Sequence, residues 1–282
     1  MGKVVNRWSL AFGAALLSVH PSARLSAQST EIILATTTST RDTGLLDSLL
    51  PVFEKRTGYT VKVIAVGSGQ ALAMGRRGDA DLVLSHAPEE ERLLTDSGYF
   101  LNRRLVMHND FIIVGPAGDP DGLRSTDSAA VAFRKLLGGR APFISRGDQS
   151  GTHQREQKLW KTAGVKPAPG AAWYVESGQG MAATLEMADE KRGYALTDRG
   201  TYLAWKDKLE LVPLVQGDGL LFNVYHVLEI NPRNAPRVNI RGGKALADFF
   251  VAPETQSWIG RFGRAKFGVS LFIPDAGKKD EW

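Results

Sequence analysis

The chain has 282 residues, of which 43% are hydrophobic and 23% charged, as is typical of a globular protein with one large domain or two smaller ones. It contains no cysteine, which excludes disulfides, thiol catalysis, cysteine–metal sites and a cysteine-anchored lipid. Its formal net charge of +5 is not concentrated in a basic run interleaved with aromatic residues, so we expect no nucleic-acid partner.

Residues 1–27 have the pattern of a secretory signal peptide. A basic start precedes a short apolar run at 10–19, and Ala23 and Ala27 offer cleavage sites. We expect cleavage after Ala27, with Ala23 as the alternative site and an uncleaved anchor as the competing interpretation. Residues 1–27 hold three basic and no acidic residues, so the remainder has a net charge of +2. No later stretch approaches the ~20 apolar residues of a membrane span, and we expect an exported, periplasmic protein.

The first stretch after the signal peptide is expected to pass from a strand into a helix through a run of hydroxyls. Ile32–Ala35 is apolar and predicts a buried strand, and the helical spacing of apolar residues predicts a helix over Leu45–Lys55 that ends at Gly58. Between them lie five consecutive hydroxyl residues, Thr36, Thr37, Thr38, Ser39 and Thr40. Such a turn either caps the helix, through Ser39 or Thr40, or binds an anion at the helix N-terminus.

Two further strand–turn–helix units follow. Strands are expected at 59–66 and 80–85, and helices at 71–77 and 88–96. Ser68 lies in the first turn, where it either caps a helix or faces a ligand, and Gly69 lets backbone N–H groups approach a bound group. His86 is expected to be structural, or to lie near a cleft rim. Three successive units predict a parallel sheet with right-handed crossovers.

The second half repeats the alternation and predicts a second α/β lobe. Strands are expected at 111–114, 143–145, 173–175, 193–197, 209–215 and 221–230. Helices are expected at 125–137, 181–189, 198–205, 242–250 and 254–263, with one more within Arg146–Lys161. The turn-rich break at 115–122 is a plausible boundary.

Hydroxyl- and glycine-rich turns recur at four strand–helix junctions. They lie at 36–40, at Ser68, at Ser150-Gly151-Thr152 and at Ser177-Gly178. Ligands of open α/β sheets bind beyond the carboxyl ends of the strands, so two facing lobes would enclose a small anion between helix N-termini. Arg146 is either a surface residue or the cation of this site. Asp148 could accept the proton of a phosphate, so phosphate remains possible.

Enzymatic interpretations find little support. Asp42-Thr43-Gly44 occurs once, although aspartic-protease chemistry needs paired carboxylates, and there is no Gly-x-Ser-x-Gly elbow. Ser150, His153 and Glu156 resemble a triad only in composition, because Ser150 and His153 lie within one turn. We expect no enzyme, no cofactor and no bare metal ion. A secreted hydrolase is the alternative from another class.

Over essentially the whole chain after the signal peptide, the sequence resembles the TupA-type tungstate-binding proteins of ABC transporters. The resemblance is carried by TTTSTRDTGLLDSLLPVFE at 36–54, VGSGQAL at 66–72, GDADLVLSHAPEEE at 78–91, NDFIIVGP at 109–116, SRGDQSGTH at 145–153, ESGQGM at 176–181 and GYALTDRGTY at 193–202. It implies a type II periplasmic-binding-protein fold, an α/β fold of two lobes joined by hinge strands with the ligand cleft between them.

With this resemblance we expect lobe I at 28–112 and 226–282, lobe II at 113–225, and hinge strands at 111–114 and 223–229. It implies a monomeric protein that captures tungstate and delivers it to an inner-membrane permease; molybdate, sulfate or phosphate are the alternatives on the same fold. The expected ligand-binding residues are Thr36, Thr37, Thr38, Ser39, Ser68, Gly69, Arg146, Ser150, Gly151, Thr152, Ser177 and Gly178.

Overall fold

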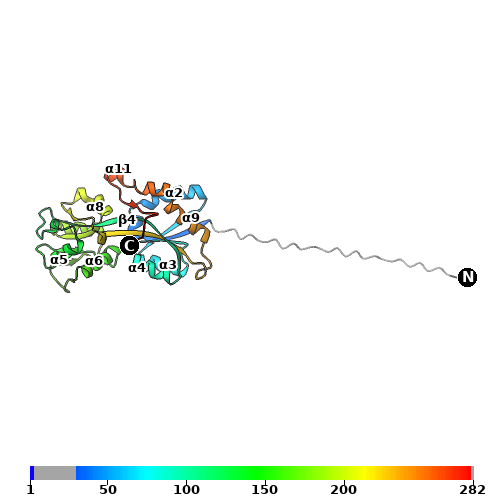
Figure 1. The fold of residues 1–282 in the computed structure, drawn as a ribbon, viewed down its shortest axis with the longest axis horizontal. Coiled ribbons are helices and arrows are strands. Elements are labelled where there is room, and N and C mark those ends of the chain that lie inside the picture. Colours follow the sequence, from blue (N-terminus) through cyan, green and yellow to red (C-terminus); the bar gives the residue numbers. More distant parts are fainter. Residues whose placement is uncertain (3–29, 281–282) are drawn as a thin grey trace.

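A mixed β-sheet crosses the whole molecule and carries helices on both faces (Figure 1). This computed structural model describes residues 1–2 and 30–280, so the predicted signal peptide lies outside the described residues apart from its first two positions. The strand order is β2-β1-β3-β9-β4-β7-β5-β6, and β8 and β10 also pair with β4.

The strands are β1 (Glu31–Thr37), β2 (Thr60–Val66), β3 (Leu82–Ser85), β4 (Phe100–Gly115), β5 (Phe143–Ser145), β6 (Tyr174–Glu176), β7 (Tyr194–Asp198), β8 (Val212–Val215), β9 (Phe222–Ile230) and β10 (Ile273–Pro274). The helices are α1 (Thr38–Asp42), α2 (Leu45–Thr57), α3 (Ser68–Arg77), α4 (Pro88–Asp96), α5 (Ala129–Leu136), α6 (Gly151–Thr162), α7 (Met181–Glu190), α8 (Arg199–Trp205), α9 (Ile240–Val251), α10 (Pro253–Ile259) and α11 (Arg264–Phe267).

Lobe I is built on the parallel strands β1, β2 and β3, as predicted. The apolar stripe of α2, which includes Leu49 and Phe53, packs with α9 against one face of this sheet. Residues of α3, among them Leu72, pack with Val83 and Phe100 against the other face. Two separate apolar cores therefore fix the sheet between helices, and each large side chain buried there contributes about 1.5–3 kcal/mol.

Lobe II repeats this three-layer arrangement with other strands. Strand β5 pairs in parallel with β6 and β7. One apolar core, beneath α5 and α6, contains Phe133, Phe143 and Trp160. The other core, beneath α7, contains Ile144 and Leu185. The carboxyl ends of the parallel strands in both lobes thus open toward the middle of the molecule, where a ligand site of an α/β sheet is expected.

Two adjacent antiparallel strands, β4 and β9, connect the lobes. Along β4, residues up to Asp110 pair with β9, whereas Phe111 and the residues after it pair with β7 and β8 of lobe II. The chain returns to lobe I where β9 begins at Phe222, opposite Asp110. The crossing points lie close to the predicted hinge strands.

The C-terminal tail closes over these connecting strands. Strand β10 pairs with β4, and Asp275 lies 2.5 Å from His108 of β4 (Oδ2 to Nδ1). Farther on, Asp280 forms an ion pair with Arg103 of β4, whose Nε lies 3.1 Å from the buried Glu91 of α4. The tail is therefore held to β4 through Asp275 and Asp280, while residues 277–280 remain exposed.

Several element boundaries differ from the sequence-based predictions. Strand β4 begins at Phe100 rather than residue 111, because polar residues occupy its first half and hide the strand pattern. Helix α5 begins at Ala129 rather than 125, since Ser128 is its cap and accepts a hydrogen bond from the N–H of Val131. The helix expected at 254–263 ends at Ile259, before Gly260. Strand β10 was not predicted, but the αL C-cap at Gly58 is confirmed.

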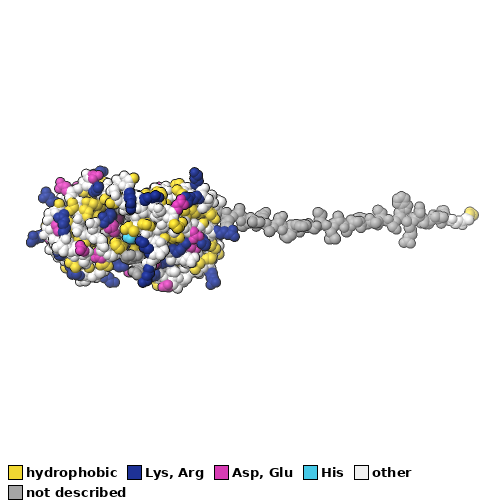
Figure 2. Space-filling view, turned by 45° about the horizontal axis from the view of Figure 1, so that its top comes forward, with side chains coloured by type: hydrophobic (Ala, Val, Ile, Leu, Met, Phe, Trp, Pro, Cys, Tyr) yellow, Lys and Arg dark blue, Asp and Glu magenta, His cyan; other side chains and the backbone are white. Residues whose placement is uncertain are grey.

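On the face drawn in Figure 2, lysine and arginine side chains are scattered among acidic, apolar and neutral ones instead of forming a stripe. Within residues 30–280, none of the helices combines the length and the hydrophobicity that crossing a bilayer requires.

Candidate functional site

A small cavity lies where the two lobes meet the connecting strands. Its volume is about 60 Å³, and residues of lobe I, lobe II, β4 and β9 all line it. One water needs roughly 10–15 Å³ and drug-sized ligands need about 300–1,000 Å³, so the space fits a small ion. Open grooves of about 960 and 700 Å³ flank the cavity and share lining residues with it, so they are the two mouths of the cleft.

The lobe I wall begins with the hydroxyl run at the end of β1. Thr37 lines the cavity and caps α1, accepting a hydrogen bond from the N–H of Thr40 (3.3 Å). The predicted cap at Ser39 or Thr40 is therefore wrong, because the strand runs two residues farther than its apolar core suggested. Thr38, the first residue of α1, also lines the cavity.

Thr36 faces the other side of the sheet, since neighbouring side chains of a strand alternate. Its hydroxyl is buried, has no hydrogen-bond partner among the described residues and does not line the cavity. The side chain of Ser39 lies outside what the structure describes.

The second part of the lobe I wall is the β2–α3 turn. Ser68 is the first residue of α3, follows the cap residue Gly67, lines the cavity and is only 6% exposed. Its hydroxyl and backbone N–H lie at a helix N-terminus, where both favour an anion. Gly69 is exposed and does not line the cavity.

The lobe II wall is one continuous loop from Arg146 to the start of α6. Both Gly147 (φ +62°) and Gln149 (φ +60°) adopt left-handed backbone conformations, which fold the loop tightly. Ser150 caps α6 by accepting a hydrogen bond from the N–H of His153 (3.3 Å). Ser150, Gly151 and Thr152 all line the cavity, at the N-terminus of a 12-residue helix.

Arg146 brings positive charge to the cavity. Its Nη2 lies 2.5 Å from Oδ2 of Asp148, and its buried Nε has no hydrogen-bond partner among the described residues. Burial opposes ionisation of Asp148, but hydrogen bonds from Ser150 and the charge of Arg146 outweigh it and hold the pKa of this carboxyl below its usual value. Asp148 does not line the cavity and holds the guanidinium instead.

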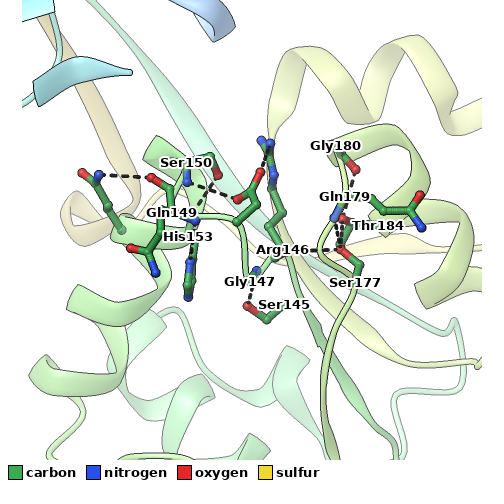
Figure 3. Close-up of polar contacts among 12 residues, drawn as sticks. Ser145, Arg146, Gly147, Gln149, Ser150, His153, Ser177, Gln179, Gly180 and Thr184 are labelled. Carbon is green, nitrogen blue, oxygen red and sulfur yellow. Dashed lines mark hydrogen bonds and ion pairs between the residues drawn. The ribbon is translucent and has the colours of Figure 1, made fainter. Parts of the chain in front are cut away.

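The turn at Ser177 and Gly178 contacts the backbone of Arg146, and Figure 3 shows Ser177 beside Arg146. The carbonyl oxygen of Arg146 accepts hydrogen bonds from the N–H of Gly178 (2.9 Å) and the hydroxyl of Ser177 (3.4 Å). The Ser177 hydroxyl also lies 2.7 Å from that of Thr184 in α7. Neither residue lines the cavity, so the structure places this fourth turn behind the loop rather than on the ligand side.

The structure thus brings together seven of the expected residues, Thr37, Thr38, Ser68, Arg146, Ser150, Gly151 and Thr152. It also brings in His86, for which a place near the cleft rim was one of two expectations, and residues that were not expected to bind the ligand, among them Thr43, Asn109, Asp198, Asn223 and Tyr225. His86 directly follows β3, in the position that the hydroxyl turns take after β1 and β2.

His86 lies in the wall itself. Its Nε2 is 3.2 Å from Oγ1 of Thr37, and its ring packs against Tyr225 with 5.0 Å between ring centroids. Burial lowers the pKa of His86 to about 4, so it is neutral at neutral pH. A Cβ on Gly151 would lie 3.0 Å from His86 Cε1, which means that the two lobes touch here.

The site lacks the arrangement of a hydrolase. The ring Nδ1 of His153 accepts the N–H of Gln149 (3.1 Å), and Ser150 is engaged as a helix cap. Glu156 instead accepts hydrogen bonds from Ser145 (2.6 Å), Tyr174 and Trp160. Asp198 is occupied in capping α8, through the N–H and hydroxyl of Thr201 (2.8 and 2.7 Å). What remains is a set of neutral donors with one guanidinium, suited to binding an anion.

Comparison with known proteins agrees with this architecture. A model of the PBP superfamily domain matches residues 22–254, and the chain is a member of that superfamily of two-lobed binding proteins. The tungstate-binding protein TupA of Peptoclostridium acidaminophilum is 47% identical over 249 residues, covering 88% of this chain and 86% of that protein.

Two solved structures are also similar. The tungstate-binding protein TupA from Desulfovibrio alaskensis G20 has a TM-score of 0.80 at 43% identity, covering 87% of this chain and 99% of that one. The tungstate ABC transporter structure from Geobacter sulfurreducens has a TM-score of 0.71 at 48% identity, covering 82% of this chain and 98% of that one. Within the superfamily, the chain belongs to the TupA family, whose members are binding proteins and not enzymes.

Proposed function

We propose that this protein is the substrate-binding component of an ABC transporter and that it captures tungstate in the cavity between its lobes. The observation that carries the proposal is the lining of the cavity, in which Thr37, Ser68, Ser150 and Thr152 converge with Arg146 on a space of about 60 Å³. The names of the TupA relatives support tungstate as the particular ion.

Binding needs no chemical step. The oxyanion exchanges its hydration shell for hydroxyl donors, for N–H groups at the starts of α3 and α6, and for the guanidinium of Arg146. Hydrogen bonds to a charged group contribute about 1.5–3 kcal/mol each, so several of them sustain tight binding. The missing partner of the buried Arg146 Nε is then an oxygen of the ligand.

Closure of the lobes is the second part of the proposal. Contacts between the lobes already span the cleft, at His86 and Gly151 and through an ion pair of 2.6 Å between Glu89 of α4 and Lys158 of α6. Rotation about β4 and β9 would separate these contacts and release the ion. The closed protein, exported to the periplasm and acting as a monomer, would dock on the membrane permease.

Isothermal titration calorimetry with tungstate, molybdate, sulfate and inorganic phosphate tests this function. We expect tungstate to bind most tightly, with molybdate nearest to it, because both are tetrahedral dianions. Stronger binding of sulfate or phosphate would reassign the substrate, and no heat with any of the four would refute the function.

A further inference from the structure

Two asparagines on the connecting strands face each other inside the cavity. Asn109 of β4 and Asn223 of β9 are paired in register across the antiparallel ladder, and both line the cavity. They are 7% and 3% exposed. They belong to neither of the donor walls described above, and they lie where the chain passes between the lobes.

Each asparagine has an unsatisfied polar atom. The side-chain carbonyl oxygens of Asn109 and Asn223 are both buried and make no hydrogen bond of normal geometry among the described residues, and the ring of His86 lies close enough to the Asn223 side chain to interact with it. An unsatisfied buried polar group is costly and uncommon, and two at one register position of one cavity point to a bound group that completes them.

A carboxamide can bind either a hydrogen-bond donor or a hydrogen-bond acceptor of a ligand. Rotation by half a turn about its last torsion exchanges the oxygen and the NH2 group within the same volume. A proton-free oxyanion has only acceptors and requires the NH2 groups. In Asn223 this rotation preserves the hydrogen bond with Tyr225. The NH2 group now donates to the hydroxyl of Tyr225 (2.8 Å), and after the rotation that hydroxyl can donate to the amide oxygen.

We propose that Asn109 and Asn223 turn their NH2 groups into the cavity and donate hydrogen bonds to the bound oxyanion, so that the connecting strands themselves hold the ligand. This rests on the proposed function and names further binding residues of the same site. It also gives the cavity a specificity element: two amide donors favour an oxyanion without a proton, whereas two amide oxygens would favour a protonated one such as hydrogen phosphate.

Calorimetry with sodium tungstate and inorganic phosphate tests the inference on the purified full-length mature protein, with Asn109→Asp, Asn223→Asp, Asn109→Ala and Asn223→Ala. We expect each Asp variant to lose at least about 100-fold in tungstate affinity, since a carboxylate of the same shape repels the anion, and each Ala variant to lose about 10- to 30-fold. Asn234→Asp is the matched control: Asn234 is exposed, its side chain donates to the carbonyl of Gly98 in lobe I, and it does not line the cavity, so the tungstate affinity of this variant should stay within twofold of wild type.

Wild-type tungstate affinity in all four Ala and Asp variants would overturn the inference, and so would a gain in phosphate affinity with no loss for tungstate. If an Asp variant does not fold, the Ala variant at that position decides. The wild-type protein separately tests the proposed function. If it binds sulfate or phosphate in preference to tungstate, that function fails, and the ratio of variant to wild-type affinity for the preferred ion still judges the asparagines. If it binds no oxyanion, both fail.

Discussion

The two walls of the cavity are built in different ways. On the lobe I side, Thr37, Ser68 and His86 come from the ends of three neighbouring strands, so the parallel sheet fixes their spacing, and all three are neutral at pH 7. On the lobe II side, Arg146, Ser150 and the start of α6 belong to one loop of left-handed turns.

The positions of the neutral donors are therefore fixed by one wall, and the positive charge is supplied by the other. A sheet edge holds neutral donors at fixed distances, whereas a guanidinium needs a loop that can place it and a partner that can orient it, here Asp148 together with the turn at Ser177. The lobe II wall supplies the charge of the site, and the lobe I wall supplies neutral donors at fixed positions. We therefore expect substitutions in the two walls to weaken ligand binding to different degrees.

Removing the charge should have the largest effect. Arg146→Ala is expected to weaken tungstate binding about 100-fold, because the ion loses its one guanidinium and Asp148 is left as an uncompensated carboxylate nearby. Calorimetry measures the change, and Arg140→Ala, which removes an exposed arginine of the same lobe, is the control. Unchanged affinity in Arg146→Ala would refute its role in the site.

Acidification should act through the lobe I wall. Unfolded His86 takes up a proton near its usual pKa of 6.5, but the folded protein does so only near 4, so the unfolded state holds more protons between these values. Stability of the ligand-free protein should therefore fall as pH drops, by about 2 kcal/mol between pH 7.5 and pH 5 from this group.

Urea unfolding of wild type and His86→Gln across this range isolates the contribution of His86. The comparison is needed because burial raises the pKa of Glu156, which favours the folded state on acidification and opposes the effect. Parallel pH profiles for the two proteins would contradict the prediction.

Removing one neutral donor should matter less than removing the charge. Ser68→Ala is expected to weaken tungstate binding about tenfold through the loss of one hydrogen bond to an anion, and to leave the melting temperature of the ligand-free protein unchanged. Ser97→Ala serves as the control in the same lobe, since the Ser97 hydroxyl donates to the carbonyl of Leu93 and does not line the cavity. A loss of tungstate affinity in Ser68→Ala as large as that in Arg146→Ala would contradict the expectation that the charge contributes more than one neutral donor.

A still smaller effect should follow from keeping the walls slightly apart. In Gly151→Ala the new methyl group would lie 3.0 Å from His86, so the lobes must stay a few tenths of an ångström more open. We expect a three- to fivefold loss of affinity, carried by faster dissociation in stopped-flow measurements. Gly180→Ala is the control, because a Cβ there meets nothing within 4 Å. Equal dissociation rates for the two variants would show that the walls do not close against each other.

The smallest effect should come from the ion pair at the mouth of the cleft. The side chains of Glu89 and Lys158 are 73% and 46% exposed, and pairs of this kind contribute at most about 1 kcal/mol. Lys158→Gln should raise the dissociation rate less than threefold at low salt and not at all at 0.5 M salt. Lys161→Gln, on the same helix, should have no effect, and a salt-independent change in Lys158→Gln would refute an electrostatic latch.

The sequence was informative where function follows from local chain geometry. A hydroxyl turn between a strand and a helix is a local pattern, and three of the four such turns contribute to the cavity. Within the first turn, which of Thr36 and Thr37 faces the cavity depends on where β1 ends. A run of five similar hydroxyl residues does not reveal that end. Ser177 has the same local pattern but faces the Arg146 loop, and only packing decides this.

The other missed residues belong to no local pattern. Asn109 and Asn223 are 114 positions apart, a separation that follows from their numbers, and become neighbours only through the pairing of β4 with β9. Asn109 lies in a polar stretch outside the predicted strand at 111–114, and Asn223 lies in the predicted strand at 221–230, where nothing local marks it as a ligand residue. Pairing between distant strands depends on the whole fold, so such residues cannot be identified from their own surroundings in the sequence.

The order of the strands also has a consequence for how the molecule forms. Lobe II is made from one continuous segment, but β9, which lies between β3 and β4 in lobe I, is among the last strands of the chain, and the tail that covers the connecting strands comes later still. In a chain made from its N-terminus, lobe II can therefore fold while the edge of β3 is still unpaired. Lobe I and the hinge are completed together, at the end of synthesis, so an incomplete chain has no means of holding the ion.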